Sequence, residues 1–263
     1  MYLIKNIQCS IRIQIKRLTE YRIALLNQIF GLFIGYISTF IVYYLMFQKF
    51  TGLEGWSFNE VMYVYSFAML TINLSSVIFN HFRHQDQEII DGSFDKYLIK
   101  PLSPFTYFCI SRIDVVELLN LFLSMIVYLY FAIVNQVYND VYNVMLIFLF
   151  MFTSTLINGS LLVLIGALSF WTKKSEILYS ALVWPFQFLS YLPIVIFPKA
   201  IQYILTYILP FGMISYYPAM IILKRIETVL VLSSLILLVS ILFFGLSYII
   251  WKIGLKKYEG TGS

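Results

Sequence analysis

Long apolar stretches without charge constrain the fold of this chain most strongly. A helix needs about 20 apolar residues to cross a membrane, because a rise of about 1.5 Å per residue must span about 30 Å of hydrocarbon. None of the stretches shows the period-2 alternation of a membrane barrel strand, so the sequence predicts an all-α polytopic membrane protein. Six stretches meet the requirement with uncharged interiors: 23–47, 58–80, 118–135, 143–171, 177–197 and 228–251.

Composition supports placing most of the chain in lipid. Hydrophobic residues make up 60% of the sequence and charged residues 12%, whereas a soluble domain has about 25% charged residues. The net charge of +5 need not indicate a nucleic-acid partner, since positive charge beside spans is what membrane topology demands. We therefore expect one transmembrane domain over 1–263, with membrane lipid as a partner and no nucleic acid.

The distribution of basic residues predicts the orientation. With six spans and both termini in the cytoplasm, 14 of the 18 Lys and Arg residues lie inside and 4 outside. Apolar residues recur every three or four positions through 1–22, among scattered basic residues, which predicts an amphipathic helix on the membrane surface. A solvated helix before the first span is the alternative.

The apolar segment 199–225 is interrupted by Pro210, Gly212 and Pro218. A proline removes a backbone donor and crowds the preceding turn, and broken helices at membrane depth occur only where protein or a cavity surrounds them. We expect an extracellular re-entrant helical hairpin before the sixth span. A seventh span is the alternative, and it would leave 13 basic residues inside and 5 outside.

The sequence lacks the residues and motifs that mark several kinds of functional site. The span interiors hold no ionisable residue, which disfavours ion-coupled transport, and no G-x-x-x-x-G-K-[ST] phosphate loop occurs. His81, His84 and Glu88 could share one helix face and ligate zinc, but we interpret them as solvated residues, so neither a metal site nor a catalytic residue is predicted. Gly31 and Gly35 form a G-x-x-x-G pattern that allows close helix packing, although chance also explains it.

The polar run 91–104 between the second and third spans has a helical pattern of its own. Ser93 can cap a helix, Asp91 and Asp95 would lie near its positive end, and Pro101 would end it. The resulting helix of about two turns would carry an apolar stripe of Phe94, Tyr97 and Leu98, with Lys96 and Lys100 on another side. Such a helix would either rest on lipid or dock into a cytoplasmic partner.

Six motifs occur along the chain in a recognisable order. They are "GWSFNEVMYVYSF" (55–67), "IIDGSFDKYLIKPLSP" (89–104), "SRIDVVELLNL" (111–121), "SFW" (169–171), "YLPIVIFP" (191–198) and "ILPFGMISYYPA" (208–219). With these motifs the chain resembles bacterial ABC transporter permeases of the type-2 exporter (ABC-2) superfamily. The second motif is fairly specific, and the later ones gain weight from their order.

The resemblance implies a fold and a set of partners. Such permeases have six spans, an N-terminal interfacial helix, a coupling helix within the cytoplasmic loop 81–117, and extracellular re-entrant helices. A separate ATPase carries ATP and Mg, a second permease completes a homodimer or heterodimer, and the assembly lies in the bacterial inner membrane. The ATPase-docking residues would be Glu88, Ile90, Asp91, Gly92, Phe94, Asp95, Lys96, Tyr97, Leu98, Lys100 and Pro101.

The predicted function is the membrane subunit of an ATP-driven exporter. Phe94, Tyr97 and Leu98 would fill a groove on the ATPase, whose motion would reach the first, second and fifth spans. The uncharged, aromatic-rich spans suggest an amphiphilic cargo such as a peptide, drug or lipid-linked molecule. The alternatives are a membrane scaffold or immunity-type binding protein without an ATPase and, less favoured, a lipid-modifying enzyme.

Overall fold

The computed structural model describes residues 22–49, 55–101, 103–110 and 115–258. These residues form helices joined by turns, without a β-strand among them. The interfacial helix predicted over 1–22 falls almost wholly outside the described residues.

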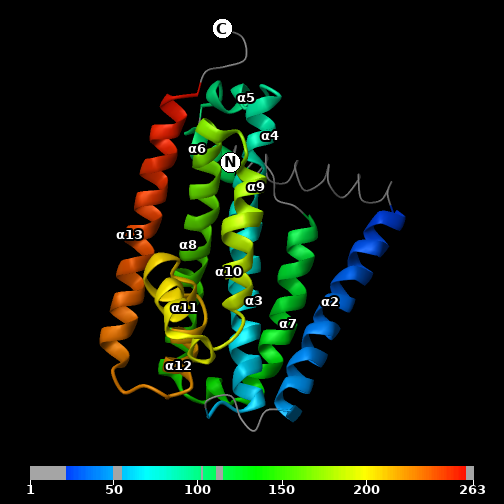
Figure 1. Cartoon of the computed structure of the whole chain (residues 1–263), viewed down its shortest axis with the longest axis vertical. Helices are drawn as coiled ribbons and strands as arrows, with labels where there is room; N and C mark the ends of the chain where they lie inside the picture. The colour runs from blue at the N-terminus through cyan, green and yellow to red at the C-terminus, as the bar shows by residue number, and fades with distance from the viewer. Residues whose placement is uncertain (1–21, 50–54, 102, 111–114, 259–263) are drawn as a thin grey trace.

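Within the part of the chain that the structure describes, five helices are long and apolar enough to cross a membrane, which confirms a multi-pass membrane protein. They are α2 (Arg22–Lys49), α3 (Phe58–Phe79), α7 (Val115–Val134), α8 (Val141–Thr172) and α13 (Val229–Lys256). Helix α8 is the most buried of them, with α3 and α13 packed along it, whereas α2 is the most exposed. Figure 1 shows α2 leaning away from the bundle. These helices coincide with five of the six predicted spans.

The predicted span 177–197 is wrong in its extent. Helix α9 (Ser175–Leu178), the π-helical turn η3 (Tyr179–Val183) and α10 (Trp184–Leu189) follow one another, and a turn then leads to the short 3₁₀ helix η4 (Ile194–Ile196). Pro185 has no N–H to donate, which accounts for the wide turn before it. Pro193 and Pro198 keep the chain beyond Leu189 from continuing the helix.

The predicted break in 199–225 is confirmed. Helix α11 (Lys199–Tyr203) and the π-helical η5 (Ile204–Ile208) meet the 3₁₀ helix η6 (Phe211–Met213) and α12 (Tyr216–Ile222) at 75°. Pro210 lies at the bend, and a Cβ at Gly212 would come within 3.3 Å of the Leu205 carbonyl oxygen. Pro218 falls in the first turn of α12, where its missing N–H costs no helical bond. A 75° bend fits both a re-entrant hairpin and a broken span, so the hairpin stays a prediction.

Close helix packing within the chain depends on other glycines than Gly31 and Gly35, whose contact with a second subunit stays a prediction. A Cβ at Gly31 or Gly35 would meet nothing within 4 Å, so the G-x-x-x-G face of α2 contacts none of the described helices. On α13, by contrast, a Cβ at Gly254 would lie 2.5 Å from the Phe170 ring of α8. The approach of α13 to α8 therefore depends on Gly254.

Two matched substitutions on α13 test this packing. Gly254→Val should lower the apparent melting temperature, because overpacking costs about 1–3 kcal/mol when a ring and a helix must shift. Gly245→Val is the control, since a Cβ there meets nothing within 4 Å. Thermal unfolding of both variants in mild detergent, followed by size-exclusion chromatography, measures the difference; equal losses would contradict the packing role of Gly254.

Candidate functional site

The predicted coupling loop is a compact helical cap at one end of the bundle. Helix α3 runs into the 3₁₀ helix η1 (Asn80–His84) and α4 (Gln85–Ile90), and then come α5 (Asp95–Leu98) and α6 (Pro104–Ile110). Gly92 takes a left-handed φ of +68° in the turn between α4 and α5, a conformation that favours glycine. Figure 1 shows this cap at the same end as the C-terminal end of α13.

The predicted coupling helix is shorter than its pattern suggested. Helix α5 has four residues, and it begins after Phe94 without a side-chain cap, so the prediction that Ser93 caps it is wrong. The helix does end before Pro101, as predicted. With a single turn, α5 cannot present a long stripe on one side.

Phe94 and Tyr97 lie inside the cap, which corrects the prediction that they form an exposed stripe. Both side chains are 0% exposed. The Phe94 ring lies 5.4 Å from the ring of Phe170 and 5.0 Å from that of Tyr258, and the Tyr97 ring lies 4.9 Å from that of Phe108. Burial of these rings against α6, α8 and the end of α13 stabilises the cap more than exposure would, because each ring removes much apolar surface from water.

Aliphatic side chains form the outer tip of the cap instead. Ile90 is 56% exposed, Leu98 45% and Ile99 82%. Asp91 and Pro101 are exposed beside them, and Gly92, Asp95, Lys96 and Lys100 are half-buried. Ile99 was not among the predicted docking residues. We call Ile90, Leu98 and Ile99 the exposed tip.

Glu88 is buried beneath this tip rather than displayed on it. Its Oε1 lies 3.3 Å from Nε2 of His81 and 3.4 Å from Nζ of Lys96. The His84 ring pairs with a different carboxylate, since its Nδ1 lies 3.1 Å from Oε2 of Glu176. The two histidines therefore do not converge, and the described residues contain no group of three or more His, Cys, Asp or Glu side chains suited to a metal ion.

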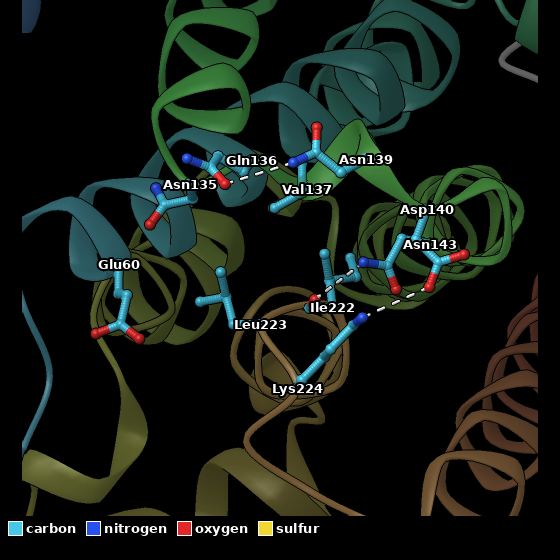
Figure 2. Close-up of a pocket in the computed structure, with 10 residues that line it drawn as sticks. All are labelled: Glu60, Asn135, Gln136, Val137, Asn139, Asp140, Asn143, Ile222, Leu223 and Lys224. Carbon is cyan, nitrogen blue, oxygen red and sulfur yellow. Dashed lines mark hydrogen bonds and ion pairs between the residues drawn. The ribbon is translucent and has the colours of Figure 1, made fainter.

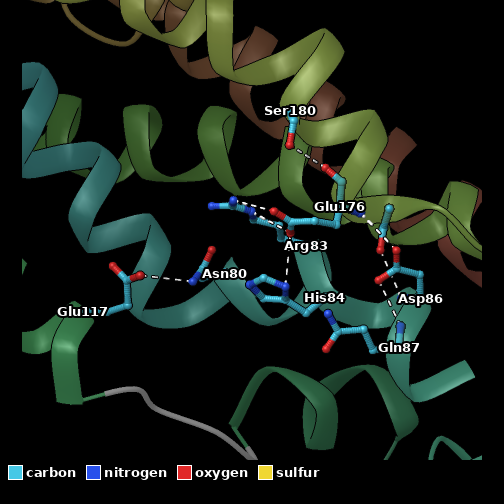
Figure 3. Close-up of polar contacts among 9 residues, drawn as sticks. Asn80, Arg83, His84, Asp86, Gln87, Glu117, Glu176 and Ser180 are labelled. Carbon is cyan, nitrogen blue, oxygen red and sulfur yellow. Dashed lines mark hydrogen bonds and ion pairs between the residues drawn. The ribbon is translucent and has the colours of Figure 1, made fainter. Parts of the chain in front are cut away.

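A network of ion pairs and hydrogen bonds ties the cap to α9. Arg83 binds both carboxylate oxygens of Glu176, at 2.8 and 2.6 Å. The Asp86 carboxylate accepts the Glu176 N–H at 3.2 Å, and the Ser175 hydroxyl accepts the Asp86 N–H at 3.0 Å. Figure 3 shows these side chains converging between the two segments. Because Asp86 holds an N–H of the first turn of α9, the start of α9 and the cap are joined.

Two further hydrogen bonds tie the cap to the end of α13. The Trp251 indole N–H donates to Gln85 Oε1 at 3.0 Å, and both side chains are buried. The Tyr258 hydroxyl donates to Asp95 Oδ1 at 2.8 Å. Burial and the neighbouring Asp95 carboxylate raise the pKa of Tyr258 to about 12, so its hydroxyl keeps its proton at neutral pH.

A family model described as "ABC-2 family transporter protein" matches residues 4–262. The chain belongs to the ABC-2 transporter family. No curated protein and no solved structure matches it. Membership makes this ABC-2 chain a membrane subunit of a transporter and implies association with an ABC ATPase.

Sequence reasoning located the cap of this ABC-2 protein but missed the contacts that hold it. Gln85 and Trp251 are 166 positions apart, and Arg83 and Glu176 are 93 apart. Helical periodicity relates residues within one element and gives no signal for such distant pairs. The charges next to the predicted spans were the available signal, and they were used only to predict the orientation.

Alanine substitutions should separate the buried ring from the exposed tip. Phe94→Ala should destabilise this ABC-2 chain by about 3–5 kcal/mol, because it empties a fully buried ring site. Leu98→Ala should stay within about 0.5–1 kcal/mol, since its side chain is 45% exposed. Thermal unfolding in the same detergent measures both; similar losses at the two positions would contradict the inward packing of Phe94.

Proposed function

We propose that this chain is the permease subunit of an ATP-driven exporter and docks its ATPase through the exposed tip. The observation that carries the proposal is the exposure of Ile90, Leu98 and Ile99 at the end of the bundle where charged residues gather. Large apolar side chains exposed on a polar surface mark a protein contact where they form one patch, and the proposal requires these three to do so. On this proposal the cap is cytoplasmic, both termini lie on that side, and the membrane is the bacterial inner membrane.

The cap is better suited to a protein partner than to lipid. Its largest rings, Phe94 and Tyr97, are buried inside, whereas an interfacial helix would turn its aromatic face to the membrane. The exposed tip is flanked by Asp91 and by Lys100, which can orient a partner by charge. A groove that accepts two or three aliphatic side chains is the complementary surface that this tip requires.

The contacts of the cap with the long helices suggest how a movement of the ATPase would be transmitted to the membrane domain. The cap continues directly from α3, binds α9 through the Arg83–Glu176 ion pair, and binds α13 through Trp251 and Tyr258. A displacement of the tip would therefore move α3, α9 and α13 together. The sequence predicted that the first span would move with the cap, but α13 takes its place, because the described part of α2 lies apart from the cap (Figure 1).

The remaining parts of the proposal follow the family resemblance. ATP and Mg would be held by the separate ATPase, and the open face of α2 would meet a second permease, either an identical chain or a homologue. The cargo would be an amphiphile, because the apolar, aromatic-rich helices offer no charged path for a small ion.

A charge placed in the tip tests the docking. Leu98→Asp should abolish co-purification of the ATPase and ATP-dependent transport, because a carboxylate would be buried without a partner in the groove. Leu98→Met is the matched control and should retain both, since it keeps the apolar surface. Pull-down from native membranes, with transport into inverted vesicles, measures the two effects.

Two results would contradict the proposal. Normal ATP-dependent transport by the folded Leu98→Asp chain would remove the docking role of the tip. A wild-type chain that purifies intact with a partner other than an ATPase would favour the scaffold alternative.

A further inference from the structure

A polar cavity lies at the opposite end of the bundle from the cap. Its volume is about 380 Å³, and its walls come from the start of α3, the loop with η2 (Val137–Asn139), the start of α8 and the end of α12. Figure 2 shows the amide and charged side chains that surround it. Volumes of about 300 Å³ or more are typical of small-molecule sites. Nothing in the docking proposal uses this cavity.

Two asparagines on the wall of the cavity have side-chain oxygens that accept no hydrogen bond from a described residue. The Asn135 amide donates to the carbonyl oxygens of Asn59 at 3.0 Å and Phe131 at 2.8 Å, which leaves its Oδ1 to accept. Asn143 is only 6% exposed, and its amide nitrogen lies 3.5 Å from the Ile222 carbonyl oxygen. Its Oδ1 accepts no hydrogen bond from any residue that the structure describes. Of these two asparagines only Asn143 is buried, so its oxygen is the acceptor that a bound donor would satisfy.

The charges around the cavity favour a cation over an anion. Glu60 is held by Arg225 at 3.0 and 2.7 Å, and Arg225 also donates to the Gly55 carbonyl oxygen, so both groups are engaged. Asp140 accepts the Tyr142 N–H through Oδ1, whereas its Oδ2 has only a loose partner, because Nζ of Lys224 lies 3.5 Å away and the Lys224 side chain is 70% exposed.

Lys224 shows which chemical group the cavity accommodates. Its backbone has a left-handed φ of +56° at the end of α12, where glycine is the usual residue. The position nevertheless carries a lysine, whose ammonium reaches the Asp140 carboxylate. An ammonium group of the chain itself thus occupies the edge of an acceptor-lined cavity.

We propose that this cavity binds a primary ammonium group, which displaces Lys224 from Asp140. The group donates to Asp140 and to the amide oxygen of Asn143, which both line the cavity (Figure 2). A trimethylammonium group has no N–H to donate, so the site should discriminate against it. Val134 ends α7 and Val141 begins α8, which puts the cavity at the level of lipid headgroups. The ammonium can therefore come from a soluble amine or from an ethanolamine lipid.

Native mass spectrometry of the full chain tests the site. The purified protein is equilibrated with equal amounts of phosphatidylethanolamine and phosphatidylcholine, and the retained lipids are compared. Wild-type protein should prefer the ethanolamine lipid about tenfold, as expected for one charge-assisted hydrogen-bonded contact. Asp140→Asn should bring the ratio of ethanolamine to choline lipid near one. The variant should keep its fold, because the Asp140 carboxylate caps α8 by accepting the Tyr142 N–H and an asparagine oxygen can accept it as well.

A matched pair of glycine substitutions tests the role of Lys224. Lys224→Gly removes the competing ammonium and relaxes the backbone, so ethanolamine-lipid retention should rise severalfold. Lys173→Gly is the control, because Lys173 has a left-handed φ of +54° at the other end of α8, away from the cavity. It should leave retention unchanged.

Competition with free ethanolamine distinguishes the two sources of ammonium. Loss of the lipid preference in millimolar ethanolamine would show that a soluble amine is accepted, and persistence of the preference would assign the site to the lipid headgroup. Equal retention of both lipids by the wild-type chain, without any ethanolamine effect, would overturn the proposal. An Asp140→Asn chain with the wild-type ratio of the two lipids would also overturn it. So would equal changes of ethanolamine-lipid retention in Lys224→Gly and Lys173→Gly. Since no ATPase enters the experiment, its failure would not bear on docking.

Discussion

The burial of Phe94 against Phe170 and Tyr258 is the contact on which the cap depends. Phe94 follows the glycine turn, Phe170 lies near the end of α8, and Tyr258 follows α13. Without this packing, α5 would have only four residues of helix to hold it, and so short a helix is not stable alone. The exposed tip is therefore presented by a fixed support, which a docking surface requires if it is to transmit force.

The parts of the fold that were predictable from sequence are those set by local chemistry. The long charge-free stretches correctly predicted α2, α3, α7, α8 and α13, and Pro210 correctly predicted the bend. The direction of a short amphipathic turn was not predictable. Phe94 and Leu98 are four residues apart and should share a helix face, yet one is 0% and the other 45% exposed. Phe170 and Tyr258, from two distant segments, cover Phe94, and helical periodicity gives no signal for such contacts.

The site depended still more on contacts between distant segments. The predicted span 177–197 was too long, because prolines beyond Leu189, rather than charges, limit the length of its helix. His81 and Glu88 were interpreted as solvated, whereas Glu88 is buried and lies 3.3 Å from His81. Arg83, Asp86 and Glu176 connect two segments of the chain. Pairing of this kind follows from the assembled bundle, and no single stretch of sequence contains it.

Helix α8 connects the two proposed sites. Asp140 precedes its first turn and lines the cavity, and Phe170 in its last turn packs on the cap. As the most buried of the long helices, α8 is suited to act as one rigid body between the two ends. Binding at the cavity would then change the position of the cap, or the reverse, only if the whole of α8 shifts against its neighbours.

The central claim is that the exposed tip contacts an ABC ATPase, and crosslinking from the tip tests it most directly. A photoreactive residue would be placed at Ile99 in native membranes, and at buried Phe94 as the control, with crosslinked proteins identified by mass spectrometry. The account predicts a crosslink from position 99 to a protein with a phosphate-binding loop, and none from position 94. Crosslinks from position 99 to lipid alone, or only to proteins without an ATPase domain, would contradict it.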